Sequence, residues 1–237
     1  MKPHLVLLPG LACDAELWRG PLPTLAAQAW VHVSDVAARE PTLPAMAARL
    51  LAEHAGDLLL AGASMGGMLA LEVQRQAPAR VKGLALLGTS ARADTPELLR
   101  LRSGAIALFE QGRMDEVLLA NVAFAFHPAH QRDSALVGRY LDMIRRAGPQ
   151  QLIHQNRAVM ARIDSRPLLP AVRCPTLVVC GEADALTPPE HAHEMAAAIP
   201  GARLELLAGA GHMLTMEQPG RVAALLAGWL QRLTWGV

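Results

Sequence analysis

Short runs of apolar residues alternate with longer amphipathic stretches along most of the chain. Each run is four or five residues long and is continuously apolar or nearly so, as buried strands of parallel sheets tend to be. Six runs predict strands: Leu5–Leu8, Trp30–Val33, Leu58–Ala61, Gly83–Leu87, Thr176–Cys180 and Arg203–Leu207. The amphipathic stretches predict helices: Pro44–His54, Met65–Gln76, Pro189–Ala198 and Pro219–Leu233. This alternation predicts an essentially parallel six-stranded sheet with helices on both faces.

One long interval interrupts the alternation. After the strand that ends at Leu87, no strand pattern occurs before Thr176. The residues between them are helical in pattern, with breaks where glycine or proline occurs. We therefore predict a helical insertion over residues 91–166, placed after the fourth strand, and an α/β core made of residues 1–90 and 167–237.

A glycine-rich turn joins the third predicted strand to the helix that follows it. Residues 62–66, Gly-Ala-Ser-Met-Gly, match the pattern G-x-S-x-G and lie between a strand and a helix, as that pattern requires. So abrupt a turn forces Ser64 into a strained conformation and exposes its Oγ above the sheet edge. Side chains at Gly62 and Gly66 would collide with the crossing backbone. The turn predicts Ser64 as a nucleophile at a helix N-terminus, where developing negative charge is favoured.

A serine nucleophile needs a base, and the base needs an acid that fixes its tautomer. The loops after the last two predicted strands carry both groups. Asp184 lies in the loop 181–188, and His212 ends the glycine-rich loop 208–212. The carboxyl ends of parallel strands meet at one edge of the sheet, so we predict that Ser64, Asp184 and His212 lie together as nucleophile, acid and base.

Other acids and histidines compete for these roles. Glu182 lies in the same loop as Asp184 but closer to the strand, and Asp94 follows the fourth predicted strand. We favour Asp184 over both. His191 and His193 could suggest a metal, but residues i and i+2 do not share a helix face, and no carboxylate or cysteine completes a ligand set. We therefore expect no metal site.

The tetrahedral intermediate of such a reaction needs N–H donors for its oxyanion. The residue after the nucleophile, Met65, is expected to supply one of them. The loop after the first strand, residues 9–14, is expected to supply the other, because Gly10 lets the chain fold back closely. We therefore predict an oxyanion hole made by the backbone N–H groups of Leu11 and Met65.

Composition and charge exclude several other classes of protein. Of the 237 residues, 52% are hydrophobic, which is enough for a large core. The net charge of +1 predicts no general attraction to nucleic acid. No apolar run approaches the roughly 20 residues that cross a membrane, and no signal-peptide pattern is visible, so we expect a cytoplasmic protein without membrane contact. The three cysteines, Cys13, Cys174 and Cys180, are too widely spaced for a zinc site or a disulfide framework.

Taken together, these features resemble the α/β-hydrolase family over nearly the whole chain. The resemblance is carried by the segments LPGLACDAELW, GASMGG, GEADALTPPE and GAGHMLTMEQP, in this order. It is closest to small, cap-bearing bacterial members, which include carboxylesterases such as the pimeloyl carrier-protein methyl ester esterases, and 3-oxoadipate enol-lactonases. The resemblance implies Ser64 as nucleophile, His212 as general base and Asp184 as its orienting acid. It also implies that the helical insertion is a cap over the site, and it implies no metal or organic cofactor.

Two departures from the family bear on these expectations. Many relatives have His-Gly after the first strand, where this chain has Pro9-Gly10. The leading antiparallel strands of larger members have no counterpart here, which again predicts six strands. In addition, serine at position 64 disfavours haloalkane dehalogenase and epoxide hydrolase chemistry, because both use a carboxylate nucleophile.

The predicted function is hydrolysis of carboxylic esters of small to medium apolar molecules through an acyl-enzyme. We expect the substrate pocket under the cap, lined mainly by apolar side chains and by methionines, which adapt to varied shapes. The candidates are Leu11, Trp18, Met65, Phe109, Phe124, Phe126, Met143, Met160, Leu186 and Met213. The predicted cap carries 11 arginines against 8 acidic residues. Such a balance could attract an acidic carrier protein, although solvated helix faces explain the same charges.

Two alternatives stay open at this point. The same three side chains could open a lactone, cleave a carbon–carbon bond in a diketone or support perhydrolysis. Outside catalysis, the chain could be a hydrolase-like binding protein that has lost turnover, but the intact serine, acid and histidine argue against this. The sequence does not define an oligomeric state.

Overall fold

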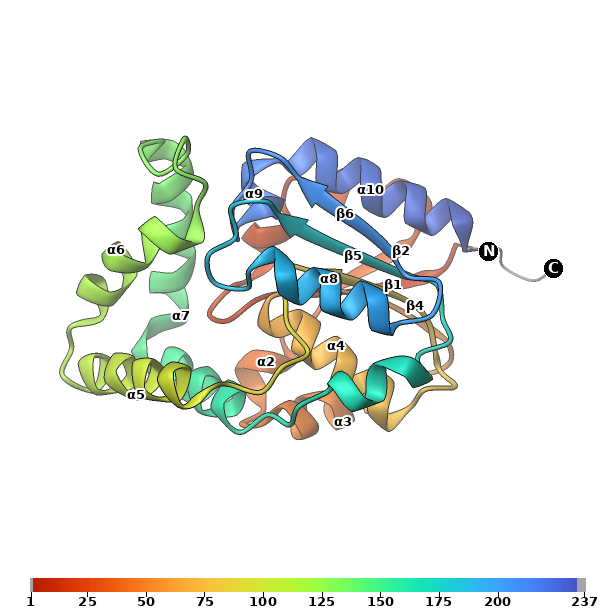
Figure 1. Cartoon of the computed structure of the whole chain (residues 1–237), viewed down its shortest axis with the longest axis horizontal. Coiled ribbons are helices and arrows are strands. Elements are labelled where there is room, and N and C mark those ends of the chain that lie inside the picture. The colour runs from red at the N-terminus through yellow and green to blue at the C-terminus, as the bar shows by residue number, and fades with distance from the viewer. Residues whose placement is uncertain (1, 234–237) are drawn as a thin grey trace.

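A six-stranded parallel sheet forms the centre of the computed structural model, which describes residues 2–233 (Figure 1). The strands are β1 (His4–Leu8), β2 (Trp30–Val33), β3 (Leu58–Ala63), β4 (Val81–Leu87), β5 (Thr176–Gly181) and β6 (Arg203–Leu207). They lie in the order β2-β1-β3-β4-β5-β6, and each neighbouring pair is parallel. The six predicted strands and their parallel arrangement are confirmed. Met1 and residues 234–237, the outer ends of the predicted core, lie outside the described residues.

Helices cover both faces of this sheet. One face packs against α1 (Leu22–Gln28) and α10 (Pro219–Arg232), and the other packs against α2 (Val36–Arg39), α3 (Leu43–Glu53), α4 (Met65–Gln76) and α8 (Pro189–Ala198). Successive residues of a strand point to opposite faces, so Leu5 and Leu7 pack into one apolar cluster, whereas Val6 and Leu8 pack into the other. The near-continuous apolar runs of the sequence therefore serve two cores at once.

The four helices predicted between the strands match α3, α4, α8 and α10 to within one residue at each end. Several shorter elements were not predicted: α1, α2, α9 (Leu214–Glu217), and the 3-10 helices Ala15–Trp18 and Arg166–Ala171. Each is four to seven residues long, too short to show a helical period in the sequence. Within residues 2–233, no helix is both long enough and apolar enough to span a bilayer.

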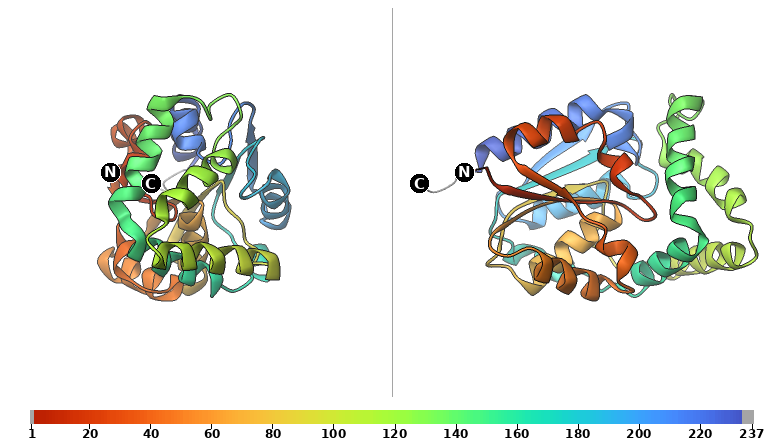
Figure 2. Two further views of the ribbon diagram at one scale, coloured as in Figure 1. Left: turned by 90° about the vertical axis from the view of Figure 1, so that its left-hand side faces the viewer. Right: turned by 180° about the vertical axis from the view of Figure 1, so that it is seen from behind.

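Three α-helices between β4 and β5 lie beyond the carboxyl ends of the strands (Figures 1 and 2). They are α5 (Pro96–Glu110), α6 (Met114–Ala125) and α7 (Ser134–Met160), and we call residues 91–166 the helical segment. The chain leaves and rejoins the core at one place, because the Ser165 N–H donates to the Ala91 carbonyl at 2.8 Å. This bond supports the predicted division into core and cap, which stays a prediction.

α7 changes direction near its middle. Gly148 has a φ of 77° and a ψ of 171°, values outside the helical region, and Pro149 follows it. The bend lets the first half of α7 stand beyond the strand ends, while the second half runs back toward α2 and α3 (Figure 2). Residues of the second half thereby reach the core.

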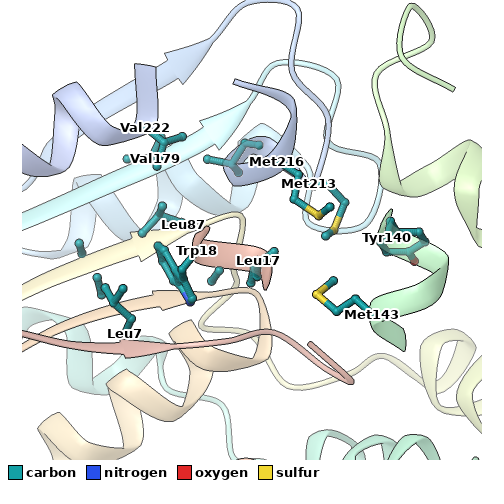
Figure 3. Packing of buried hydrophobic residues seen from close by; sticks show 14 of the residues in the cluster. Leu7, Leu17, Trp18, Leu87, Tyr140, Met143, Val179, Met213, Met216 and Val222 are labelled. Carbon is teal, nitrogen blue, oxygen red and sulfur yellow. The ribbon is translucent and has the colours of Figure 1, made fainter. Parts of the chain in front are cut away.

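An apolar cluster joins the helical segment to the sheet (Figure 3). Tyr140 and Met143 of α7 lie on the same side of this cluster as Met213. Trp18 lies deeper, near Leu7 and Leu87 of the sheet. Each large apolar side chain that is fully buried contributes about 1.5–3 kcal/mol, whereas exposed ion pairs contribute about 0–1 kcal/mol. Apolar burial is therefore the main attachment of the helical segment.

Candidate active site

The turn between β3 and α4 has a strained backbone at its serine. Ser64 has a φ of 53° and a ψ of −118°, a combination that costs a non-glycine residue roughly 1–3 kcal/mol. Two neighbouring groups hold it there. The Ser64 N–H donates to the Leu87 carbonyl at 2.9 Å, and the Thr89 hydroxyl donates to the Ser64 carbonyl at 2.7 Å. The sheet and its following loop thus offset the strain.

Two glycines allow this turn to be so tight. A Cβ atom on Gly62 would lie 2.2 Å from the Gly66 carbonyl oxygen, and one on Gly66 would lie 2.0 Å from the Leu8 carbonyl oxygen. Neither position can hold a side chain while β1, β3 and α4 keep their places. The low helix propensity of glycine, roughly 1 kcal/mol worse than alanine, is accepted because the backbones approach so closely.

The structure brings Ser64, Asp184 and His212 together. His212 Nε2 lies 3.0 Å from Ser64 Oγ, and His212 Nδ1 lies 2.9 Å from Asp184 Oδ2. The three side chains follow β3, β5 and β6, so the parallel sheet aligns their loops at one edge. A hydrogen-bond chain from hydroxyl to imidazole to carboxylate results.

The competing acids lie elsewhere. Glu182 is exposed to solvent. Asp94 is buried, but it pairs with Arg102 at 2.7 Å and with Arg162 at 2.8 Å. Asp184 is the carboxylate that faces the imidazole of His212.

Asp184 is buried among hydrogen-bond donors. Its Oδ1 accepts the N–H groups of Leu186 at 2.9 Å and of Thr187 at 2.8 Å, and its Oδ2 accepts the Thr187 hydroxyl at 2.9 Å. Burial by itself raises the pKa of Asp184, but the charge of His212, its hydrogen bond and the Thr187 donors outweigh burial and leave the pKa below its usual value. Asp184 is therefore an anion at neutral pH, fixed in place by its own loop.

The pKa of His212 is shifted the other way. Burial lowers it, but the charge and hydrogen bond of Asp184, together with the charge of Glu217, raise it above the usual value for histidine. Because the Asp184 carboxylate occupies the Nδ1 side, Nε2 is the atom that can take a proton from Ser64. The arrangement favours an imidazolium once such a proton has been transferred.

A second buried carboxylate, on Glu217 of α9, was not predicted. Its side chain has no exposed area. One oxygen, Oε1, accepts the Gly211 N–H at 2.8 Å; the other, Oε2, accepts the His127 N–H at 2.8 Å and lies 2.8 Å from His130 Nδ1. Glu217 therefore joins the loop that carries His212 to the connection between α6 and α7. In the sequence Glu217 lies five positions after His212, but no sequence pattern predicts which groups its carboxylate contacts.

A turn after β1 lies beside the serine. We call residues 10–13 the oxyanion turn, after the predicted role of Leu11; the Cys13 N–H donates to the Gly10 carbonyl at 3.1 Å and closes it. Its third residue, Ala12, has a φ of 55°, as a type II turn requires, at a cost of about 1–2 kcal/mol for alanine. A Cβ atom on Gly10 would lie 3.4 Å from Ser64 Cβ, so the turn packs against the serine.

The two predicted oxyanion donors are available in this geometry. Among the hydrogen bonds of residues 2–233, none uses the Leu11 N–H. Met65 is the first residue of α4, so its N–H has no partner carbonyl within that helix. Both N–H groups belong to segments that contact Ser64.

The predicted pocket residues fall into different environments. Phe124 and Leu186 are exposed, Leu11 and Met160 are half-buried, and the others are buried: Trp18, Met65, Phe109, Phe126, Met143 and Met213. Met143 and Met213 lie on the side of the apolar cluster where α7 meets the loop of His212 (Figure 3). Trp18, by contrast, has 0% exposure and lies over the sheet, where it serves the core.

A cavity of about 340 Å³ lies on the β2 side of the oxyanion turn. The oxyanion turn, the connection from β2 to α2, and α7 line it, and Met143 is the one predicted pocket residue among its lining. None of Ser64, Asp184 and His212 lines it. Burial raises the pKa of the Cys13 thiol at its wall to about 12, so that thiol stays protonated. The cavity is therefore next to the candidate site and separate from it.

Comparison with known proteins places this chain in a family. The sequence profile of the alpha/beta hydrolase family matches residues 5–225. The chain belongs to that family. This α/β-hydrolase is 28% identical to a pimeloyl-acyl-carrier-protein methyl ester esterase of Aromatoleum aromaticum, and the match covers 95% of the chain and 97% of the relative.

Solved structures agree with this assignment. A thermophilic esterase from Thermogutta terrifontis superposes with a TM-score of 0.90 and 28% identity, covering 99% of this chain and 92% of that one. The enol-lactonase of Burkholderia xenovorans LB400 superposes with a TM-score of 0.86 at 22% identity, covering 98% and 92%, and so shares the fold. This α/β-hydrolase is thus similar to enzymes that hydrolyse esters.

Proposed function

We propose that this α/β-hydrolase is a serine esterase in which Ser64 attacks the carbonyl carbon of a carboxylic ester. One observation carries the proposal: a serine on a strained turn is hydrogen-bonded to His212, which is itself bonded to the buried anion of Asp184. Structural serines do not need a base at 3.0 Å that a carboxylate orients.

In the proposed mechanism, His212 Nε2 takes the proton of Ser64 Oγ as that oxygen attacks the carbonyl. The ester oxygen becomes an oxyanion, which the N–H groups of Leu11 and Met65 stabilise. His212 then gives its proton to the leaving alcohol, and an acyl group remains on Ser64. Water, activated by the same imidazole, attacks the acyl-enzyme and releases the acid. Asp184 stays ionised and stabilises the imidazolium in both steps.

We propose that the ester has a small to medium apolar acyl or alcohol group. Met143 of α7 and Met213 beside His212 support this, because they lie where the helical segment meets the loop of the base (Figure 3). Methionine side chains adapt to ligands of varied shape. The exposed apolar side chains of Phe124 and Leu186, on α6 and in the loop of Asp184, are further candidates for contacts with the substrate.

An acidic carrier protein as partner has weaker support. Ten of the 11 arginines in the helical segment already form ion pairs with carboxylates of this chain. An acidic partner would have to displace those carboxylates. The relative from Aromatoleum aromaticum is named for a carrier-protein ester, so such an ester belongs in the substrate panel beside free ones.

The test is turnover of p-nitrophenyl esters of increasing acyl length by the wild type and by Ser64→Ala. We expect kcat to fall by about 10⁴-fold or more in Ser64→Ala. Ser103→Ala is the matched control, because Ser103 Oγ is exposed on α5 and bonds only to the backbone of its own helix. It should keep the wild-type rate.

A second measurement does not depend on the choice of ester. A fluorophosphonate should label the wild type and Ser103→Ala at one residue and should not label Ser64→Ala. Absence of both turnover and labelling in the wild type would refute the proposed function. If lactones are turned over faster than open-chain esters, the proposed catalytic residues are retained, but the proposed substrate class changes from esters to lactones.

A further inference from the structure

Gln155, in the second half of α7, makes a contact that no sequence motif predicts. Its side chain is 1% exposed, and its Oε1 accepts the Ala12 N–H at 2.6 Å. Its Nε2 donates to the Ala37 carbonyl at 2.9 Å. The two partners are a donor and an acceptor, so they fix which way round the amide lies. The bond to Ala12 joins residues 143 positions apart.

The backbone of Ala12 explains why this contact matters. Its φ of 55° is unfavourable for alanine, and rotation of the peptide between Leu11 and Ala12 would relieve it. That rotation would turn the Ala12 N–H away from Gln155 and leave the buried Oε1 without its partner. Gln155 therefore opposes the relaxation of the oxyanion turn.

We propose that Gln155 positions the oxyanion turn, so that the turn keeps the backbone conformation in which the Leu11 N–H can bind the oxyanion formed at Ser64. This inference rests on the proposed function. Gln155 does not touch the reacting atoms; it acts through the turn that packs against Ser64, which makes it a positioning residue. The helical segment thus helps to build the oxyanion hole as well as standing over the strand ends.

The chemistry of an amide suits this place. A leucine of similar size would leave the buried Ala12 N–H and the half-buried Ala37 carbonyl without these partners. An ionised carboxylate could accept from Ala12 but would face the Ala37 carbonyl oxygen and would bring negative charge toward a developing oxyanion. A neutral carboxyl can replace the amide, because one oxygen accepts while the O–H donates.

The first experiment compares Gln155→Leu with Gln151→Leu. Gln151 lies one turn earlier on α7 and lines the same cavity as Gln155, so the pair separates the bond to Ala12 from a change in the cavity wall. We expect Gln155→Leu to lower kcat about 10- to 100-fold with little change in KM, less than the 100- to 1,000-fold loss typical of removing an oxyanion donor. Gln151→Leu should keep the wild-type kcat.

The second experiment uses Gln155→Glu, which keeps the size of the side chain. With the introduced carboxyl protonated, both bonds can form; once it ionises, the bond to Ala37 is lost. We therefore expect the ratio of the variant's kcat to the wild-type kcat, measured at each pH, to fall as pH rises. Melting temperatures recorded at the same pH values separate this effect from unfolding, because the ratio should fall while the variant is still folded.

The outcomes distinguish this inference from the proposed function. A wild type without turnover or fluorophosphonate labelling refutes the proposed function. An active wild type with a folded Gln155→Leu that matches Gln151→Leu in kcat, or with a pH-independent ratio for Gln155→Glu, overturns the positioning role of Gln155. A loss confined to KM would also overturn it, because positioning of an oxyanion donor acts on kcat.

Discussion

Two loops lie beside Ser64, and a buried polar side chain links each of them to the helical segment; one of these side chains is neutral and the other is charged. The oxyanion turn is held by the neutral amide of Gln155. The loop of residues 208–213, which we call the base loop, is held by the carboxylate of Glu217, which joins it to the connection between α6 and α7. Both side chains are buried, and each accepts a backbone N–H.

The difference follows from the charge that each loop has to stabilise in the proposed reaction. The oxyanion turn must bind a developing negative charge, which a nearby carboxylate would oppose. The base loop carries His212, which becomes positive, and a buried anion near it favours that state. In the proposed reaction, the hydrogen-bond acceptor at each loop therefore suits the charge that forms beside that loop.

The largest effect should come from removing the anion in direct contact with His212. Asp184→Asn should lower kcat about 10⁴-fold, because the amide can hold the imidazole in the wrong tautomer. The rate of ester hydrolysis measures this. Glu182→Gln is the matched control from the same loop, where the carboxylate is exposed, and it should be nearly as active as the wild type. The reverse ranking would give the role of the acid to Glu182.

The second effect tests the charge at the base loop. Glu217→Gln removes a buried charge and a charge-assisted bond of about 1.5–3 kcal/mol, so we expect kcat/KM to fall about 10- to 100-fold. The charge of Glu217 raises the pKa of His212. A neutral side chain should therefore move the acidic limb of the profile of kcat/KM against pH toward lower pH.

The control for this prediction is Glu205→Gln, which removes a carboxylate from β6 that pairs with Arg203. It should leave the acidic limb in place. If the acidic limb also stays in place in Glu217→Gln, the carboxylate of Glu217 acts through its hydrogen bonds and not through its charge. The two loops would then not differ in the charge that they require.

A smaller effect should follow from His130→Ala. This change removes one of the three partners of Glu217 and leaves its bonds to Gly211 and His127. His130 is about one-third exposed, so we expect a loss of roughly 1 kcal/mol or less in the free energy of unfolding and a change in kcat/KM of about fivefold or less. Combination with Glu217→Gln in a double-mutant cycle should show non-additive effects. Additive effects would mean that the two side chains do not act together.

The smallest effect on activity should come from a cluster of three histidines around the buried His54, which touches neither loop. The ring of His54 lies 4.8 Å from that of His4 and 4.9 Å from that of His32. Burial, then repulsion among the three histidines, lowers the pKa of His54, and burial with the charge of His32 lowers that of His4. The folded protein then binds fewer protons than the unfolded chain at pH values just below the ordinary pKa of histidine, about 6.5. The free energy of unfolding should fall as pH drops through that range.

His54→Gln removes the central ring of this cluster and should reduce the loss of stability in acid. Urea unfolding at pH 7.5 and pH 5.5 measures it, and we expect the difference in the free energy of unfolding between the two pH values to shrink. Activity at neutral pH should not change. A large loss of kcat would connect this cluster to the reaction and weaken the assignment of positioning to Gln155 and Glu217.

Much of the fold and of the candidate site follows from local patterns. The runs around Leu5, Leu59 and Val178 are apolar because both faces of their strands are buried, and this leaves a clear signal in the sequence. Ser64 could be found from the glycines that its turn requires. Asp184 and His212 could then be found because a parallel sheet brings the loops after its strands to one edge.

Other features leave no such signal. The short helix α1 shows less than two helical turns of periodicity. Trp18 was predicted to line the substrate pocket, but its side chain packs over the sheet, with an exposure of 0%. An apolar residue in a short 3-10 helix does not reveal from the sequence which way its side chain points.

The sequence by itself determined the parallel sheet, the strained serine turn and the order of the three side chains, because each depends on spacings of a few residues. Only the tertiary structure decided which polar side chains hold the loops around Ser64. Gln155 lies 143 positions from Ala12 and Glu217 lies 90 positions from His127. Such contacts depend on how the helical segment folds back onto the core. A single buried polar residue forms no periodic pattern in the sequence, so nothing there predicts its partner.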